Sequence, residues 1–339
     1  MKNLLLLSGI AILFISCNQS KQEIPSNVEA GTPKKVKIIF DTDMGPDYDD
    51  VGAIAVLHAL ADKGECEILA TLSSNRYNYS AATIEAFNTY FNKPEIPIGL
   101  PVDKGPQMIY RNNWNDSIVT KYLHNKTDLT YPSAVEVYRK VLAAQPDKSV
   151  TIVTVGFFTN LAELLQSQPD EYSNLVGREL IKTKVKELVS MAGKFPEGYE
   201  FNVEKDSTAA HYAINNWPTP VLFSGFEIGF SILTGNKVAQ TADATNPVAW
   251  AYRYNLETYG KNPAKNRQSW DQTAVLCAVR NPEQYFYILG PGKLNVEESG
   301  YNAWDAETDA DHYFLVHKYP YGQIANLLDE LMMHTPVNQ

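Results

Sequence analysis

VKIIFDTDMGPDYDD, residues 36–50, joins a short apolar run to a loop that contains Asp41, Asp43, Asp47, Asp49 and Asp50. The apolar run predicts a buried strand over 36–40, and the VGAIAVLHALA that follows predicts a helix near 50–63. Carboxylates crowded between a strand and the N-terminus of a helix repel one another and need a counter-charge. Because hard divalent cations such as Ca²⁺ or Mg²⁺ prefer oxygen ligands, we expect the loop to bind such a cation rather than to form a solvated acidic turn.

Strand and helix patterns alternate beyond this loop. Further strands are predicted over 66–72, 96–100, 150–155, 185–192 and 220–226, and further helices over about 80–92, over 133–144 and from Thr159. This alternation predicts an α/β fold with an open, mainly parallel, Rossmann-like sheet covered by helices on both faces. From about residue 230 the pattern predicts a helical C-terminal elaboration on the carboxyl end of the sheet. Ligands of such sheets bind outside the carboxyl ends of the strands.

The N-terminal segment predicts processing rather than fold. Lys2 precedes an apolar run that ends in FISC, which resembles a bacterial lipobox, so residues 1–16 are predicted to be a lipoprotein signal peptide. Residues 17–34 would then be an acylated Cys17 and a flexible tether, and 35–339 a single domain. This predicts a protein of the bacterial cell envelope, on the periplasmic face or the cell surface, that meets the membrane only through its lipid. An ordinary secretory signal is the alternative.

Composition narrows the function classes. The chain has 39 acidic and 29 basic residues, a formal charge of −10, and no clustered Lys/Arg stretch, so a nucleic-acid partner is not expected. Its three cysteines are too few for a disulfide framework. We expect Cys66 and Cys277 to be packing residues.

Two families begin with an apolar strand that leads into Asp-x-Asp: the haloacid-dehalogenase-like phosphatases and the inosine-uridine nucleoside hydrolases. The downstream sequence resembles the second family in LATLSSNRYNYSAATIEAF, IPIGLPVDKG, VTIVTVGFFTNLAELL, MAGKFPEGYEFNVEKDSTAA and SWDQTAVLCAV. These segments occur in the family's order and cover roughly residues 35–280. The resemblance implies a nucleoside hydrolase that releases a base from a nucleoside or related riboside, as in purine or pyrimidine nucleoside catabolism.

The resemblance also implies roles for individual residues. Asp43, Asp50, the backbone carbonyl of Val155 and Asp271 would be ligands of Ca²⁺, and Asp43 would be the general base for metal-bound water that attacks the anomeric carbon. Asp49, Glu200 and Asn202 would hold the ribose, with Asn75 as a weaker candidate. Asp41 would lie behind these residues and orient the loop.

Three departures from the family pattern concern the substrate. Two extra residues between Gly45 and the Asp pair make Asp47 an alternative occupant of the ribose or metal position. The segment from Gly193 to Glu200 is short, so an Asn that normally contacts ribose has no counterpart. Trp270 replaces a His that helps the base depart; it would stack on a planar base or belong to the core. His124, Tyr77 and Tyr199 are other candidate proton donors.

Two alternatives to the enzyme remain open from the sequence. One is a non-catalytic envelope lipoprotein that keeps the metal pocket to bind a sugar or nucleoside. The other is a phosphatase of the dehalogenase-like kind. For the hydrolase and for the binding protein, the expected partner is a small riboside. The resemblance adds the expectation of a homodimer or homotetramer.

Overall fold

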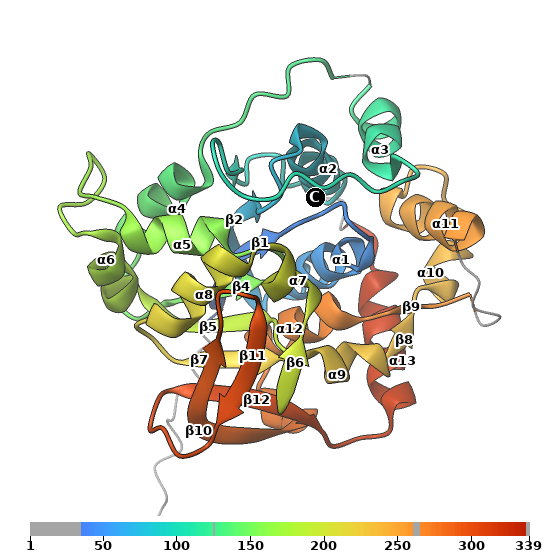
Figure 1. Cartoon of the computed structure of the whole chain (residues 1–339). Coiled ribbons are helices and arrows are strands. Elements are labelled where there is room, and N and C mark those ends of the chain that lie inside the picture. The colour runs from blue at the N-terminus through green and yellow to red at the C-terminus, as the bar shows by residue number, and fades with distance from the viewer. Residues whose placement is uncertain (1–34, 125, 260–264, 337–339) are drawn as a thin grey trace, which may run out of the picture. The chain divides into compact units, whose positions relative to one another are not determined.

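The computed structural model describes residues 35–124, 126–259 and 265–336. The described residues, from Lys35 onward, form one compact unit (Figure 1). The signal peptide, Cys17 and the tether predicted within residues 1–34 lie outside the described residues. Of the helices that the structure does describe, none has the length and apolar character needed to cross a membrane.

A large sheet runs through the unit. Its strands are β1 (Val36–Thr42), β2 (Cys66–Ser73), β3 (Ile98–Gly99), β4 (Val150–Thr154), β5 (Val185–Met191), β6 (Glu197–Tyr199), β7 (Val221–Ser224), β10 (Phe286–Val296), β11 (Tyr301–Asp305) and β12 (His312–His317). Their spatial order is β3-β2-β1-β4-β5-β7-β12-β10-β11-β6. Every pair from β3 to β12 is parallel, and the remaining pairs are antiparallel. The predicted α/β class with a mainly parallel sheet is confirmed, and all six predicted strands are present.

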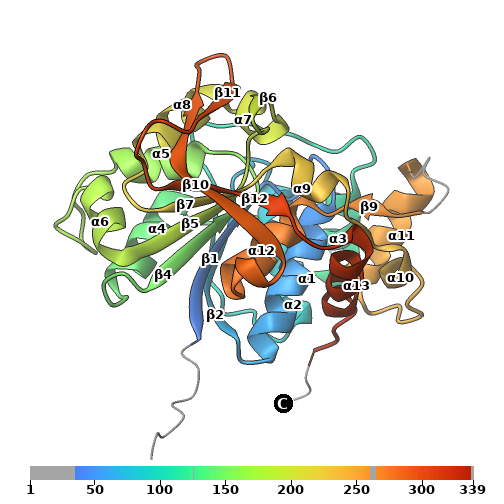
Figure 2. The ribbon, with the colours of Figure 1, turned by 90° about the horizontal axis from the view of Figure 1, so that it is seen from below.

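Helices cover both faces of the sheet, as Figure 2 shows. One face carries α1 (Asp49–Asp62), α2 (Asn78–Tyr90), α12 (Trp270–Val279) and α13 (Tyr321–Met332), and the other carries α4 (Ala134–Ala143), α5 (Thr159–Gln166), α6 (Gly177–Lys184) and α8 (Ser207–Asn216). Successive side chains of a strand point to opposite faces. Accordingly Ile38 and Phe40 enter the core beside α1, while Ile39 enters the core beside α4 and α5. Cys66 and Cys277 are both buried and unpaired.

The C-terminal part is less helical than the sequence predicted. It does contain α10 (Asn236–Ala239), α11 (Pro247–Tyr259), α12 and α13, but residues 286–317 form the strands β10, β11 and β12. Strand β10 is not predicted from the sequence, because Gly290, Pro291 and Gly292 interrupt the alternation of apolar and polar residues that marks a strand. The pairing register of β10 with β12 also shifts at this point. Two short strands, β8 (Leu233–Thr234) and β9 (Arg267–Gln268), form a separate small sheet.

The sheet order reverses at β1, which lies between β2 and β4. The connections that leave these central strands diverge, and this opens a crevice at their carboxyl ends. Asp41, at the end of β1, is fully buried and points away from the crevice toward α4 and α5. It accepts hydrogen bonds from the Tyr138 hydroxyl at 2.9 Å and from Asn160 Nδ2 at 3.0 Å. Burial raises the pKa of Asp41 to about 7, and these hydrogen bonds oppose that shift.

We expect Asn160→Ala to lower the free energy of unfolding by about 2–3 kcal/mol, because it removes a buried donor from a carboxylate. Asn160 Nδ2 also donates to the carbonyl of Ser73, so the change loosens β2 as well. Urea denaturation would measure the loss. Asn216→Ala, at an exposed amide on α8, is the matched control and should change stability by less than about 0.5 kcal/mol. Equal effects of the two substitutions would contradict the structural role of Asn160.

Candidate functional site

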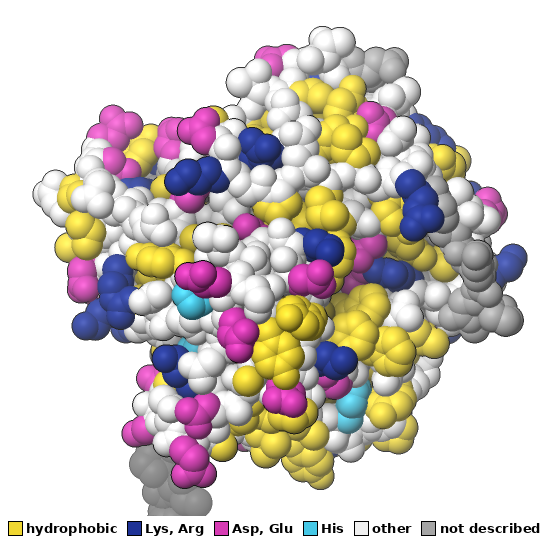
Figure 3. Space-filling view, viewed as in Figure 1, with side chains coloured by type: hydrophobic (Ala, Val, Ile, Leu, Met, Phe, Trp, Pro, Cys, Tyr) yellow, Lys and Arg dark blue, Asp and Glu magenta, His cyan; other side chains and the backbone are white. Residues whose placement is uncertain are grey.

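A cavity of about 250 Å³ lies at the carboxyl ends of the central strands. It is lined by Asp43, Asp47, Asp49, Val155, Met191, Glu200, Phe201, Asn202, Phe226, Arg267, Trp270 and Asp271. On the face seen in Figure 3, hydrophobic side chains gather around β6 and α9 (Phe226–Phe230). Tyr199, Phe201 and Phe230 are among the exposed ones. The lining combines carboxylates with aromatic rings, as expected of a site for a ligand that has both polar and flat parts.

Two loops approach very closely on one side of the cavity. A Cβ atom on Gly156 would lie 2.3 Å from the backbone nitrogen of Asp43, so only glycine fits at this position. The loop after β4 can therefore lie against the loop after β1. As a result the carbonyl of Val155 and the carboxylate of Asp43 line the same cavity.

Three carboxylates of the site lack full compensation. Asp43 and Asp271 line the cavity, and the Asp43 carboxyl group is within hydrogen-bond reach of the Asp50 carboxyl group. Burial and neighbouring aspartates raise the pKa of both Asp43 and Asp271. Asp50 accepts hydrogen bonds from the Thr42 hydroxyl and, at 3.1 Å, from the backbone nitrogen of Met44. Its Oδ2 is buried without a partner, and burial raises the pKa of Asp50 to about 7. Positive charge at this point would stabilise all three groups.

The donor chemistry here fits a hard divalent cation, which prefers carboxylate and carbonyl oxygens. Asp43, Asp50, Asp271 and the Val155 carbonyl supply such oxygens, and the orphaned Oδ2 of Asp50 is the buried acceptor that most needs a partner. Within the described residues, however, no three acidic, histidine or cysteine side chains converge closely enough to form a metal site by themselves. The residues therefore suit a cation chemically, although their side chains are not closed around one point.

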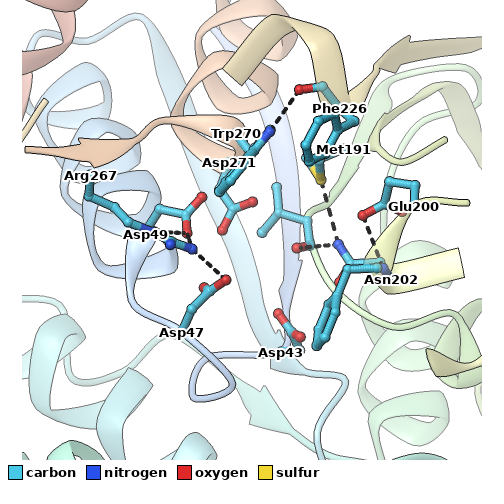
Figure 4. Close-up of a pocket in the computed structure, with 12 residues that line it drawn as sticks. Asp43, Asp47, Asp49, Met191, Glu200, Asn202, Phe226, Arg267, Trp270 and Asp271 are labelled. Atoms are coloured by element: carbon cyan, nitrogen blue, oxygen red, sulfur yellow. Dashed lines mark hydrogen bonds and ion pairs between the residues drawn. The ribbon is translucent and has the colours of Figure 1, made fainter. Parts of the chain in front are cut away.

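Arg267 is the main feature of the site that the sequence did not predict. Its Nη2 contacts Asp47 Oδ2 at 2.6 Å and Asp49 Oδ1 at 2.8 Å, and its Nε donates to Asp49 Oδ1 at 3.1 Å (Figure 4). The guanidinium carbon lies 5.3 Å from the ring centre of Tyr48 and 5.0 Å from that of Trp270. Burial raises the pKa of Asp49 to about 7 despite this cation. No signal in the sequence links Arg267 to aspartates more than 200 positions away.

Glu200 and Asn202 lie on the opposite side of the cavity, at the start of α7 (Phe201–Lys205). Glu200 accepts hydrogen bonds from the backbone nitrogens of Asn202 and Val203, at 3.0 and 3.2 Å, and burial raises its pKa to about 7. Asn202 Nδ2 donates to the Val155 carbonyl at 3.2 Å. The pairing of β6 with β11 holds this segment in place.

Several predicted residues lie away from the cavity. The amide of Asn75 is taken up by backbone groups: it donates to the carbonyls of Asp43 and Met108 and accepts from the nitrogens of Tyr77 and Met108. Of the candidate proton donors, the Tyr77 hydroxyl donates a hydrogen bond to Asp116. Neither His124 nor Tyr199 lines the cavity.

Trp270 is part of the cavity wall, and its polar atom is occupied. Its Nε1 donates to the carbonyl of Phe226 at 2.8 Å, and the two rings lie 5.5 Å apart at an angle of 32°. Arg267 lies over the same indole ring. The side chain therefore contributes an aromatic surface to the cavity and no free N–H group.

The sequence is similar to that of known nucleoside hydrolases. The inosine-uridine preferring nucleoside hydrolase family matches residues 38–312. Pyrimidine-specific ribonucleoside hydrolase RihA of Salmonella paratyphi B is 29% identical over 235 residues, which are 62% of this chain and 67% of that protein. The inosine-uridine preferring nucleoside hydrolase of Leishmania major is 25% identical over 283 residues, 77% of this chain and 81% of that one.

The structural comparison shows the same fold. The solved structure of an inosine-guanosine nucleoside hydrolase superposes with a TM-score of 0.68 at 18% identity, covering 88% of this chain and 99% of the other. A plant nucleoside hydrolase superposes with a TM-score of 0.67 at 17% identity, with 88% and 99% covered. The sequence match spans most of the folded unit, and the chain therefore belongs to the inosine-uridine preferring nucleoside hydrolase family of enzymes.

Proposed function

We propose that this protein hydrolyses the N-glycosidic bond of a ribonucleoside or related riboside with the help of Ca²⁺. Water would attack the anomeric carbon, and the base would leave. The observation that carries the proposal is the set of uncompensated carboxylates, Asp43, Asp50 and Asp271, beside the Val155 carbonyl in a chain of this family. These four groups are the ones proposed to hold the cation.

Asp43 is the proposed general base. Its carboxylate lines the cavity, and burial and the neighbouring acids raise its pKa, so the group has a strong tendency to accept a proton. A cation held beside it would polarise water and offset the repulsion among the acids. Asp43 would then take the proton that water loses as its oxygen bonds to the anomeric carbon.

The sugar would lie between Asp49 on one side and Glu200 and Asn202 on the other. Each carboxylate oxygen can accept more than one hydrogen bond, so the backbone contacts of Glu200 leave it able to accept a hydroxyl proton. The amide oxygen of Asn202 receives no hydrogen bond from the described residues. Asp47 lies close enough to Asp49 to share Arg267, so it is a further candidate contact.

The leaving group is proposed to be a flat base, because Phe226 and Trp270 form an aromatic wall. The relatives differ in the base they act on: one is named pyrimidine-specific and another inosine-guanosine. Their names therefore support either a purine or a pyrimidine.

The cellular setting is also proposed from the sequence alone. Acylation at Cys17 would attach the enzyme to the bacterial cell envelope, and the family resemblance adds the proposal of a homodimer or homotetramer. Globomycin, which blocks lipoprotein signal cleavage, would leave a longer precursor if this is correct.

A second candidate function is binding without turnover. Trp270 in place of His, and the short segment before Glu200, favour it because both remove groups that would assist the reaction. Calorimetry that detects nucleoside binding without release of ribose would support this candidate. The family match rules out the dehalogenase-like phosphatase considered from the sequence.

We expect Asp43→Asn to reduce kcat for nucleoside hydrolysis by about 10²–10⁴-fold, because the amide cannot accept the proton of the attacking water. A reducing-sugar assay with purine and pyrimidine nucleosides in the presence of Ca²⁺ would measure it. Asp128→Asn, at an exposed loop residue, is the control and should have wild-type activity. The hydrolase function fails if the wild-type protein releases no ribose from any of these nucleosides. The role of Asp43 fails if Asp43→Asn releases ribose as fast as the wild type does.

Ca²⁺ should stabilise the protein more at pH 8 than at pH 5. Burial raises the pKa of Asp49, Asp50 and Glu200 to about 7, so the folded, metal-free protein retains protons that the unfolded chain releases near pH 4. The stability that these groups contribute is complete below about pH 4 and is lost as the pH rises through 7. A cation that binds the ionised carboxylates offsets this loss.

Thermal unfolding at both pH values, with EDTA or with CaCl₂, tests this expectation. At 100 times its Kd, Ca²⁺ should add about 2.7 kcal/mol at pH 8. Asp271→Asn should remove most of the increment. An increment of equal size at both pH values would contradict it.

A further inference from the structure

The base that departs takes up negative charge, and the cavity offers few groups to stabilise it. Trp270 Nε1 is bonded to Phe226, and Asn202 Nδ2 is bonded to Val155. No His, Lys, Tyr or Cys is among the residues that line the cavity. Arg267 is the one side chain in this lining that carries a positive charge and can donate a hydrogen bond to an anion.

The geometry leaves one end of Arg267 available. Nε and Nη2 donate to Asp47 and Asp49, whereas Nη1 makes no hydrogen bond with the described residues, and the Arg267 side chain is 19% exposed. Two ion pairs and the rings of Tyr48 and Trp270 hold the planar group. A guanidinium fixed in this way loses little side-chain entropy when it binds a ligand.

Arg267 also lies in the right part of the cavity. It bridges from Asp49, the proposed ribose contact, to Trp270, the proposed wall of the base site (Figure 4). A donor at this junction is beside the bond that must break. The charged groups that face it are Asp47 and Asp49, and the hydroxyls of Tyr48 and Tyr252 also lie within its electrostatic reach.

We propose that Arg267 is the catalytic residue that stabilises the departing base, through a hydrogen bond from Nη1, in place of a general acid. This inference rests on the proposed hydrolase function. As the C–N bond breaks, its electron pair goes to the base nitrogen, and Arg267 keeps its proton. The oxygen of water bonds to the anomeric carbon, and its proton goes to Asp43. The base afterwards takes a proton from solvent, and Asp43 releases the proton it gained to solvent.

Two substrates with different leaving groups test the proposal. In Arg267→Met, kcat for inosine and uridine should fall by about 10²–10³-fold, the usual effect of removing one donor to a developing anion. With 4-nitrophenyl riboside, whose leaving group is stable as an anion, kcat should stay within about threefold of wild type. For inosine and uridine, kcat of Arg267→Lys should lie between the values of the wild type and of Arg267→Met, because lysine keeps the positive charge but lacks the planar, forked guanidinium group.

The control is Arg280→Met, which removes another partly buried, ion-paired arginine that does not line the cavity. It should affect both substrates equally and slightly. Equal losses for the two substrates in Arg267→Met would overturn the proposal and leave Arg267 a purely structural role. Wild-type protein that cleaves neither substrate would overturn the hydrolase function and this proposal together.

Arg267→Met leaves the buried Asp49 and the partly exposed Asp47 without their cationic partner, so the variant needs a control for loss of folding. The double variant Asp47→Asn/Arg267→Met removes one of these charges and should show the same dependence on leaving group. A second measurement compares slopes instead of absolute rates: across substituted phenyl ribosides, the slope of log(kcat/KM) against the pKa of the leaving phenol should be shallower in the wild type than in Asp47→Asn/Arg267→Met, because Arg267 stabilises part of the negative charge on the leaving group. Equal slopes in the two proteins would overturn the proposal.

Discussion

Repulsion among buried carboxylates is the constraint on which the rest of the site depends. Asp43, Asp47, Asp49, Asp50 and Asp271 meet at the end of β1, and burial raises their pKa values. The protein itself compensates only part of this charge. Arg267 forms ion pairs with Asp47 and Asp49. The Thr42 hydroxyl and the Met44 backbone nitrogen donate hydrogen bonds to one oxygen of Asp50. This uncompensated charge is the physical reason for the cation proposed at Asp43, Asp50 and Asp271.

Polar side chains on the two faces of β1 have different partners. The alternation of a strand sends Asp41 toward α4 and α5, where Tyr138 and Asn160 bind it, and sends Thr42 toward Asp50 at the start of α1. Neighbouring aspartates thus have opposite tasks. Asp41 ties layers of the fold together, whereas Asp43, Asp47 and Asp49 line the cavity and Asp50 is fully buried. This explains how so many carboxylates fit at the end of one strand.

Sequence patterns predicted the central strands well, because buried parallel strands are continuous apolar runs bounded by turns. They also predicted the crevice and most of the residues that line it. They did not predict β10, because a Gly-Pro-Gly interruption disrupts its alternation, and they placed Asn75 in the site although backbone groups occupy its amide. Arg267 went unnoticed because a lone arginine in NRQSWD gives no sign of the partner it will meet.

The sequence by itself determined the α/β class, the family and the acids of the first loop, since these depend on local periodicity and on motifs in a fixed order. Only the tertiary structure decided which charges meet. The approach of Gly156 to Asp43, the pairing of β6 with β11 and the contact of Arg267 with Asp47 and Asp49 join segments distant along the chain. Such contacts depend on how strands and loops pack in space, which spacing along a sequence does not encode.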